Sequence, residues 1–386
     1  MYIENLYIII SDVKEKGEQS WIMRNQIEDH RLIHTNVDNG SFISIDDENE
    51  DENTPSDIIH NASKAILDDL SKHSEAKTEN NSRVLDVEYL IFSGGGGKGM
   101  AFCGTLLVLE EYARTGLLSP SSIKGCSGTS IGCVFALMYI LRTRCKDLFR
   151  LLFEEHLLDD MEPEMDLNQM YSEYGLDRGE RLKSALLQLM KTSLPDSVDP
   201  ETLTYADLYE STGKRLTCTA TDITHGCISH LSHETVPDMF VWRGLMASMA
   251  VPLLFRPVQY AGHLYVDGAV VNNLPLVTAP TNKILAFKLT SPIHVKTIDQ
   301  IRESGFSAYI QRIFECGLEY REQDQIDREF PQNKTHRLVH VDSGCIGTLH
   351  FTFSHKEQVN TVLKGMISTH HGMWKARLGM IFGVRE

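Results

Sequence analysis

Two glycine-framed segments constrain the fold of this chain more than any other feature. The first, Gly94–Gly99 (GGGGKG), follows the apolar run Val87–Phe92 and precedes a segment with helical apolar spacing. The second, Gly128–Gly132 (GTSIG), follows the short run Ser122–Cys126 and precedes the almost wholly apolar run 131–141. Repeated strand–turn–helix units predict an α/β fold with a mostly parallel sheet that is covered on both faces.

The rest of the chain continues this alternation. Three further segments have the composition of strands: Arg215–Thr221, His263–Val266 and Ile284–Leu289. Helices are predicted over 240–250 and from His355 onward, where apolar residues fall on one stripe. Residues 145–214 are predicted to be helical and more polar, with a break between Pro195 and Pro200.

The N-terminal part differs in composition from the remainder. Residues 46–52 (DDENEDE) form an acidic run, and 71–82 are polar without an apolar period. We therefore expect residues 1–84 to be an acidic, flexible arm. Residues 85–290 are expected to form the catalytic domain, and residues 291–386 a helical part that packs on it.

The net charge of −16 argues against a nucleic-acid-binding role, because contacts with phosphates need a basic surface. It also makes strongly anionic membranes a poor binding surface. The eight cysteines contain no C-x-x-C pair, which favours buried free thiols over a disulfide framework or a zinc site.

The glycine loop has three competing interpretations. Dinucleotide binding needs an acidic residue at the end of the next strand, where the sequence has Lys124-Gly125-Cys126 instead. A P-loop needs Ser or Thr after the lysine, and Lys98 is followed by Gly99. A plain turn stays possible. The favoured interpretation is an oxyanion hole, because glycine amides at a helix start can approach a developing negative charge. The candidate residues are Gly94, Gly95, Gly96, Gly97, Lys98 and Gly99.

Ser130 is the candidate nucleophile. Gly128 and Gly132 give the space that a sharp strand-to-helix turn around a serine requires. The alternative is a serine that simply caps the following helix. Asp267 is the candidate base, because it ends a predicted strand and is followed by Gly268 and Ala269. An ordinary Asp-Gly turn is the alternative there.

The order of these segments also carries a family resemblance. GGGGKG, GTSIG and DGA stand in the order of a glycine-rich oxyanion loop, a G-x-S-x-G nucleophile and a D-G-G/A motif. The sequence segments on either side of Asp267, ASMAVP at 247–252 and NNLP at 272–275, also resemble those around the aspartate of the same family. Over residues 86–380 the chain resembles the patatin-like phospholipases. The resemblance implies a patatin-like three-layer α/β/α fold with a mostly parallel central sheet.

The resemblance also implies a Ser130–Asp267 dyad that works through an acyl-enzyme. The expected activity is that of a lipid acyl hydrolase of the phospholipase A or lysophospholipase type, without metal or cofactor. Its expected partners are phospholipid or lysophospholipid and, peripherally, the membrane surface; the sequence identifies no protein activator. Residues 145–214 match the family least, so acyl-chain preference does not transfer.

Two alternatives stay open. One is an α/β-hydrolase-like esterase whose triad adds a histidine that follows Asp267. The candidates are His294, His336, His340, His350, His355, His370 and His371. The other is a catalytically silent interaction module of the same fold. Because the sequence has neither a secretory signal nor an apolar stretch of about 18 residues, we expect a cytoplasmic protein or one peripheral on membranes.

Overall fold

A computed structural model describes residues 59, 64, 84–157, 166–291, 297–303, 305–329, 337–348 and 352–382. Most of the predicted arm, 1–84, therefore lies outside the described residues. One of its residues that is described, Ile59, is helical and packs in the main hydrophobic core with 1% of its surface exposed.

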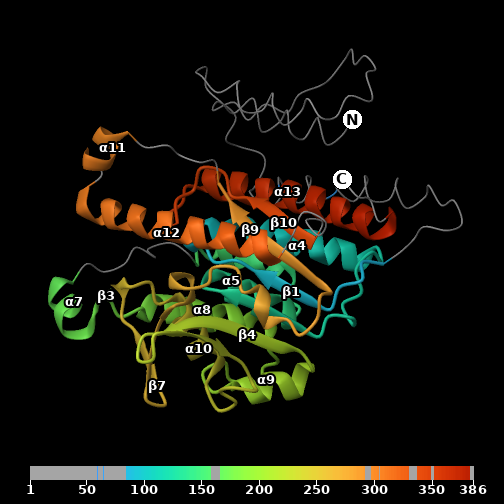
Figure 1. The fold of residues 1–386 in the computed structure, drawn as a ribbon. Helices are drawn as coiled ribbons and strands as arrows, with labels where there is room; N and C mark the ends of the chain where they lie inside the picture. The colour runs from blue at the N-terminus through green and yellow to red at the C-terminus, as the bar shows by residue number, and fades with distance from the viewer. Residues whose placement is uncertain are drawn as a thin grey trace, which may run out of the picture.

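An eight-stranded sheet forms the centre of the molecule (Figure 1). Its strands are β1 (Tyr89–Phe92), β2 (Gly125–Thr129), β4 (Arg215–Asp222), β5 (Cys227–Leu231), β7 (Val258–Tyr260), β8 (His263–Asp267), β9 (Ile284–Thr290) and β10 (Leu338–Asp342). The strand order is β10-β9-β1-β2-β4-β8-β7, with β5 paired to β4 outside this path. Two short strands, β3 (Gly175–Asp177) and β6 (Leu253–Phe255), pair separately.

The helices between and after the strands have the following bounds: α4 (Ala101–Arg114), α5 (Ile131–Ile140), α6 (Cys145–Phe149), α7 (Leu167–Glu173), α8 (Glu180–Ser193), α9 (Tyr205–Thr212), α10 (Val241–Met249), α11 (Ile298–Glu303), α12 (Gly305–Glu329) and α13 (His355–Phe382). Four shorter helical turns are η1 (Gly96–Met100), η2 (Arg150–Glu154), η3 (Gly268–Val270) and η4 (Leu276–Thr278).

The sheet is mostly parallel, as the sequence predicts. The run from β10 through β9, β1 and β2 to β4 is parallel throughout. The neighbours on the other side of this run, β8 and β7, are antiparallel, as is β5. This arrangement is a mixed α/β fold with a central, mostly parallel sheet.

The residues of β1 show how the sheet is covered on both faces. Leu90 and Phe92 point into the main core with α4, α5 and α13, whereas Tyr89 and Ile91 pack in a second cluster with Leu274. Alternation of this kind on a fully buried strand places one apolar layer on each side of the sheet. Figure 1 shows α13 lying along α4, and the two helices are in contact.

The predicted helices and strands are largely present, with shifted ends. The second strand begins at Gly125 and runs directly into Ser130, rather than covering 122–126. The break after α8 is also present. The C-terminal part, 291–386, contributes a strand, β10, in addition to α11, α12 and α13, and the sequence analysis did not anticipate this strand.

Candidate active site

Ser130 occupies a strained turn between β2 and α5. Its backbone has φ 52° and ψ −128°, and residues other than glycine rarely adopt a positive φ. The side chain is buried, with 5% of the residue exposed. A serine held in this way at the start of a buried helix has the geometry of a nucleophile elbow.

The two framing glycines are required by close backbone packing. A Cβ atom on Gly128 would lie 2.3 Å from the carbonyl carbon of Gly132. One on Gly132 would lie 2.5 Å from the carbonyl oxygens of Phe92 and Ser93, at the end of β1. Any side chain at either position would therefore push the turn away from the sheet.

Asp267 reaches the same place from β8. In the parallel β2–β4 ladder Thr129 is opposite Thr219, and in the antiparallel β4–β8 ladder Ala220 is opposite Asp267. β4 therefore brings the last residue of β8 next to the end of β2. Gly268 is needed for this approach, because its Cβ would lie 2.1 Å from the Thr219 carbonyl oxygen.

The Ser130 side chain lies close enough to the Asp267 carboxylate for its hydroxyl to lower the pKa of that carboxylate. The carboxylate also accepts a hydrogen bond from the backbone N–H of Ala269, with 2.8 Å between N and Oδ1. Burial raises the pKa of Asp267 to about 6, against the opposing effect of the hydrogen bonds from Ala269 and Ser130. The group is therefore a carboxylate at neutral pH, but a more basic one than an exposed aspartate.

The glycine loop lies directly beside Ser130. An ideal Cβ on Gly94 would be 3.4 Å from the Cβ of Ser130, and one on Gly99 would be 2.4 Å from Cγ1 of Ile131. The loop thus passes over the start of α5.

The amides of this loop are unequally available. Gly94 donates to the Asn273 carbonyl (3.0 Å), Gly97 to the Thr348 carbonyl (2.9 Å), and Lys98 to the Gly95 carbonyl (3.1 Å). Within the part of the chain that the structure describes, the N–H groups of Gly95 and Gly96 have no acceptor. Of the predicted oxyanion-loop residues, these two carry amides that an external oxygen can use.

Two residues that the sequence analysis did not single out support this geometry. The Ser248 hydroxyl, on α10, accepts a hydrogen bond from the Ser130 N–H (2.9 Å) and donates to the Thr219 carbonyl (2.5 Å). Asn273 holds Gly94 through its carbonyl oxygen, and its side-chain amide donates to Glu322 (3.1 Å). Both lie in the ASMAVP and NNLP segments, but neither segment contains a pattern that marks these roles.

The histidines that follow Asp267, as far as the structure describes them, make their contacts away from Ser130 and Asp267. His340 is on β10, and His370 contacts Tyr112 from α13. His355 stacks on His156. Three other candidates, His294, His336 and His350, lie outside the described residues.

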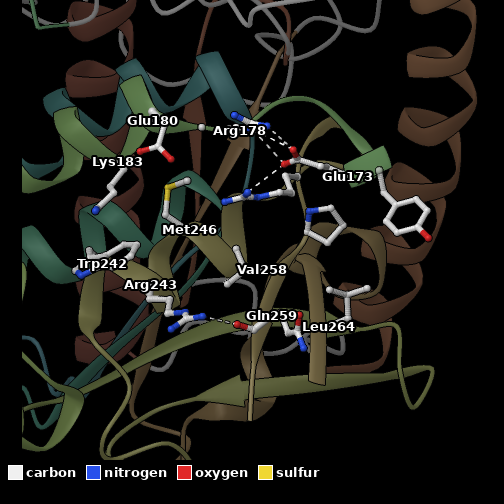
Figure 2. Close-up of a pocket in the computed structure, with 14 residues that line it drawn as sticks. Glu173, Arg178, Glu180, Lys183, Trp242, Arg243, Met246, Val258, Gln259 and Leu264 are labelled. Atoms are coloured by element: carbon white, nitrogen blue, oxygen red, sulfur yellow. Dashed lines mark hydrogen bonds and ion pairs between the residues drawn. The ribbon is translucent and has the colours of Figure 1, made fainter. Parts of the chain in front are cut away.

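A separate cavity of about 700 Å³ lies beside α10 (Figure 2). Its lining includes Lys183 from α8, Trp242 and Met246 from α10, and Val258 and Leu264 from the β7–β8 hairpin. Neither Ser130 nor Asp267 is among the residues that line it.

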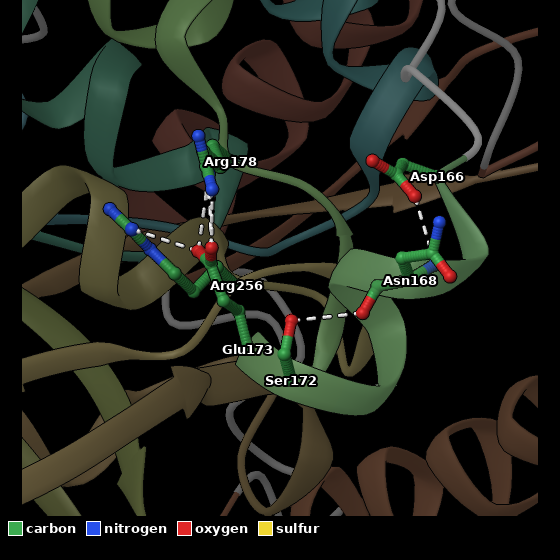
Figure 3. A network of polar contacts seen from close by, with 6 residues as sticks. All are labelled: Asp166, Asn168, Ser172, Glu173, Arg178 and Arg256. Carbon is green, nitrogen blue, oxygen red and sulfur yellow. Dashed lines mark hydrogen bonds and ion pairs between the residues drawn. The ribbon is translucent and has the colours of Figure 1, made fainter.

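One edge of this cavity is fixed by an ion-pair network (Figure 3). The carboxylate of Glu173 pairs with Arg178 (2.5 Å) and with Arg256 (3.1 Å). On the same helix, the Ser172 hydroxyl donates to the Asn168 carbonyl (2.9 Å). The network joins α7 to the segments that follow β3 and β6.

The comparison with protein families agrees with this geometry. The family described as patatin-like phospholipase matches residues 90–280, which contain the glycine loop, Ser130 and Asp267. Residues 90–280 belong to the patatin-like phospholipase family.

Curated relatives of this patatin-like domain include viral and bacterial proteins. A probable lipid hydrolase, 463L of invertebrate iridescent virus 6, is 29% identical over 188 residues, which are 48% of this chain and 61% of that protein. The uncharacterized protein YqhO of Bacillus subtilis is 28% identical over 204 residues, 48% of this chain and 64% of YqhO. The chain thus spans about three fifths of the length of these relatives.

Solved structures with a similar patatin-like arrangement include two bacterial proteins. VipD from Legionella pneumophila has a TM-score of 0.47 at 16% identity, covering 78% of this chain and 72% of VipD. The type III effector ExoU has a TM-score of 0.41 at 16% identity, covering 76% of this chain and 54% of ExoU.

Among the described residues, no helix combines the length and apolarity that a membrane span needs.

Proposed function

We propose that this chain is a lipid acyl hydrolase of the phospholipase A or lysophospholipase type that uses Ser130 and Asp267 as a dyad. The observation that carries the proposal is the juxtaposition of Ser130, on a strained turn of a patatin-like domain, with the buried Asp267 carboxylate, whose pKa the serine side chain lowers. The name of the viral relative as a lipid hydrolase supports the same substrate class.

In the first half-reaction Asp267 acts as the general base. It takes the hydroxyl proton of Ser130 while Oγ forms a bond with the ester carbonyl carbon of the lipid. The carbonyl oxygen becomes an oxyanion. When the tetrahedral intermediate collapses, the ester C–O bond breaks and Asp267 returns the proton to the leaving alkoxide. The acyl group stays on Ser130.

In the second half-reaction a water molecule replaces the alcohol. Asp267 accepts a proton from the water, whose oxygen attacks the acyl-enzyme carbonyl. Cleavage of the Ser130 ester bond then releases the fatty acid, and the proton passes to Oγ of Ser130. The pKa of about 6 suits this role, since the base is ionised at neutral pH and still takes up a proton readily.

The N–H groups of Gly95 and Gly96 are the proposed oxyanion donors. They have no acceptor in the described structure, they start a helical turn, and their loop passes beside Ser130. Preorganised donors of this kind typically contribute about 10²–10³ in kcat each. Lys98, in the same turn, adds positive charge near the site.

The proposed substrates are glycerophospholipids or lysophospholipids presented at a membrane surface. With a net charge of −16, the protein should act on zwitterionic lipid in preference to strongly anionic lipid at low salt. The chain's own acyl transfer residues are a serine and a carboxylate, so no calcium requirement is proposed.

The test uses mixed phospholipid vesicles and identification of the products by mass. Wild-type protein should release free fatty acid and the matching lysolipid or glycerol phosphodiester, and Ser130→Ala should release neither. If the protein cleaves short acetyl esters but releases no fatty acid from phospholipid, the lipid assignment is contradicted. A folded wild-type protein that fails to react with any ester would indicate a silent interaction module.

A further inference from the structure

A second cluster of reactive side chains lies at the opposite end of β8 from Asp267. Asp222, the last residue of β4, receives His225 from the following turn and His263 from the start of β8. The Nδ1 atoms of His225 and His263 lie 2.8 Å and 2.7 Å from the same carboxylate oxygen, Oδ2. All three ligand atoms lie within 4.8 Å of one another.

We propose that Asp222, His225 and His263 bind a divalent transition-metal ion of the zinc class, which holds the β4–β5 and β7–β8 turns together. Two imidazoles and one carboxylate are a donor set that Zn²⁺ uses with water in the remaining position. This site is separate from the proposed hydrolytic residues, and the ion takes no part in acyl transfer. No metal is expected from the sequence, because His263 lies 41 residues from Asp222 and no local pattern joins the two turns.

The scaffold around the cluster is already ordered. Oδ1 of Asp222 accepts hydrogen bonds from the backbone N–H groups of Thr224 (2.9 Å) and His225 (3.4 Å), which leaves Oδ2 facing the imidazoles. The two turns are joined by a hydrogen bond from the Leu264 N–H to the Thr224 hydroxyl (2.8 Å). A second runs from the Ile223 N–H to the Leu264 carbonyl (3.0 Å). The ligands therefore sit on backbone whose spacing is fixed.

The cluster needs only a small adjustment to admit an ion. Tetrahedral coordination at about 2.0–2.1 Å separates ligand atoms by roughly 3.3 Å, so the two contacts must each open by about half an ångström. The side chains of His225 and His263 are 58% and 39% exposed, whereas that of Asp222 is 2% exposed. The imidazoles can thus rotate outward, and water can reach the ion, while the carboxylate stays fixed.

Without a metal ion, the same contacts are hydrogen bonds between the two imidazoles and the Asp222 carboxylate. Burial raises the pKa of Asp222, but hydrogen bonds from His263, His225 and two backbone amides outweigh this effect and hold it well below its usual range. A hydrogen-bonded Asp–His cluster that binds no metal is the competing outcome, and a binding measurement separates the two.

An ion at this site would brace a wall of the large cavity. Leu264 follows His263 directly, and Val258 and Gln259 belong to the same hairpin; all three line the cavity. Fixing the hairpin to the β4–β5 turn would therefore hold this wall in place.

The test measures Zn²⁺ binding by equilibrium dialysis of metal-stripped full-length protein, followed by elemental analysis. Because exposed thiols are themselves potential zinc ligands, the exposed cysteines Cys227, Cys316 and Cys345 are replaced by serine in every sample. We expect one Zn²⁺ per chain, with affinity at least tenfold lower in His225→Ala and in His263→Ala. The control is His233→Ala, whose ring stacks on Tyr209 instead, and it should bind as the parent does.

Thermal unfolding gives a second readout that does not depend on catalysis. Zn²⁺ should raise the unfolding midpoint of the parent protein and of His233→Ala, but not that of His225→Ala. His225 is largely exposed, so its replacement leaves the core intact. Absence of Zn²⁺ binding by the parent would overturn the proposal, as would binding unchanged in both ligand variants.

Discussion

The hydroxyl of Ser248 accepts a hydrogen bond from the backbone N–H of Ser130 at 2.9 Å. It also donates a hydrogen bond to the Thr219 carbonyl on β4, so α10, the nucleophile turn and the sheet are connected through one side chain. The turn that this contact supports is the one with φ 52°. Strained backbone persists where surrounding contacts over-determine it, and Ser248 is one of those contacts.

We expect Ser248→Ala to lower kcat by roughly tenfold or more, because the turn loses a buried anchor worth about 1–3 kcal/mol. The measurement is turnover of a soluble ester, with unfolding midpoints measured in parallel. Ser232→Ala removes another fully buried serine hydroxyl, whose partners are Thr235 and the Glu234 N–H rather than Ser130, and serves as the control. Equal losses of kcat in the two variants would show that Ser248 has no special role.

Ser130→Ala, Asp267→Asn and the double variant should have similar residual activity, because a nucleophile and its base act as a unit. A fluorophosphonate probe should label wild type at Ser130 and fail to label Ser130→Ala. If the two losses multiply in the double variant, Asp267 is not the base for Ser130. Loss of activity on replacing a late histidine would instead favour a triad.

The pH dependence should follow Asp267. With a pKa of about 6, its carboxylate takes up a proton below pH 6, and kcat/KM for an uncharged soluble ester should fall about tenfold per pH unit there. A profile that stays flat down to pH 5 would contradict the assignment of Asp267 as base.

The ionisation of Asp267 that supports activity should lower the stability of the folded protein, so stability should fall as the pH rises. Because folding raises the pKa of Asp267 from 3.8 to about 6, its contribution to stability is complete below pH 3.8 and is lost as pH rises through 6. Asp267→Asn cannot ionise at this position. At pH 8 its free energy of unfolding should therefore exceed that of wild type by up to about 3 kcal/mol, and its unfolding midpoint should be higher. The difference should close toward pH 4, and thermal unfolding across this range checks it.

Gly132→Ala should destabilise the protein by about 1–3 kcal/mol or more, because the added Cβ meets carbonyl oxygens 2.5 Å away. The matched control is Gly317→Ala on α12, where the nearest atom is the flexible end of Arg321 at 3.7 Å. This control should be neutral or slightly stabilising. Similar unfolding midpoints for the two variants would show that the turn can relax.

The N-terminal part offers a prediction about folding. Deleting residues 1–57 should leave the unfolding midpoint nearly unchanged if this part is a loose arm. Deleting residues 1–75 also removes Ile59, which is buried in the main core, and should cost about 2–5 kcal/mol. Ile59→Ala in the full chain is the matched point variant, and a negligible effect there would show that Ile59 contributes little.

Much of the fold follows from local sequence patterns. The apolar runs that became β1, β4 and β9 are continuous enough to be read as buried strands, and α5 is apolar on every side. Strands such as β5 and β10 were not recognised, because their alternating or mixed residues resemble loops and helices. Their place in the sheet depends on contacts with β4 and β9, which local patterns do not encode.

The candidate site divides in the same way. Gly128, Ser130 and Gly132 form a local motif, so the sequence predicts both the turn and the nucleophile. Which loop amides are free could not be predicted, since it depends on the carbonyls of Asn273 and Thr348. The Asp222 cluster was missed for a similar reason, because His263 joins it only through the pairing of β8 with β4.

The antiparallel pairing of β8 with β4 makes the Ser130–Asp267 contact discrete rather than adjustable. Asp267 is opposite Ala220 in this ladder, and a slip by one residue would put Val266 in its place and turn the carboxylate to the other face of the sheet. No intermediate spacing exists between these two registers. A chain that has paired β8 correctly therefore has Asp267 beside Ser130, and we expect a mispaired chain to lack the proposed base however compact it is.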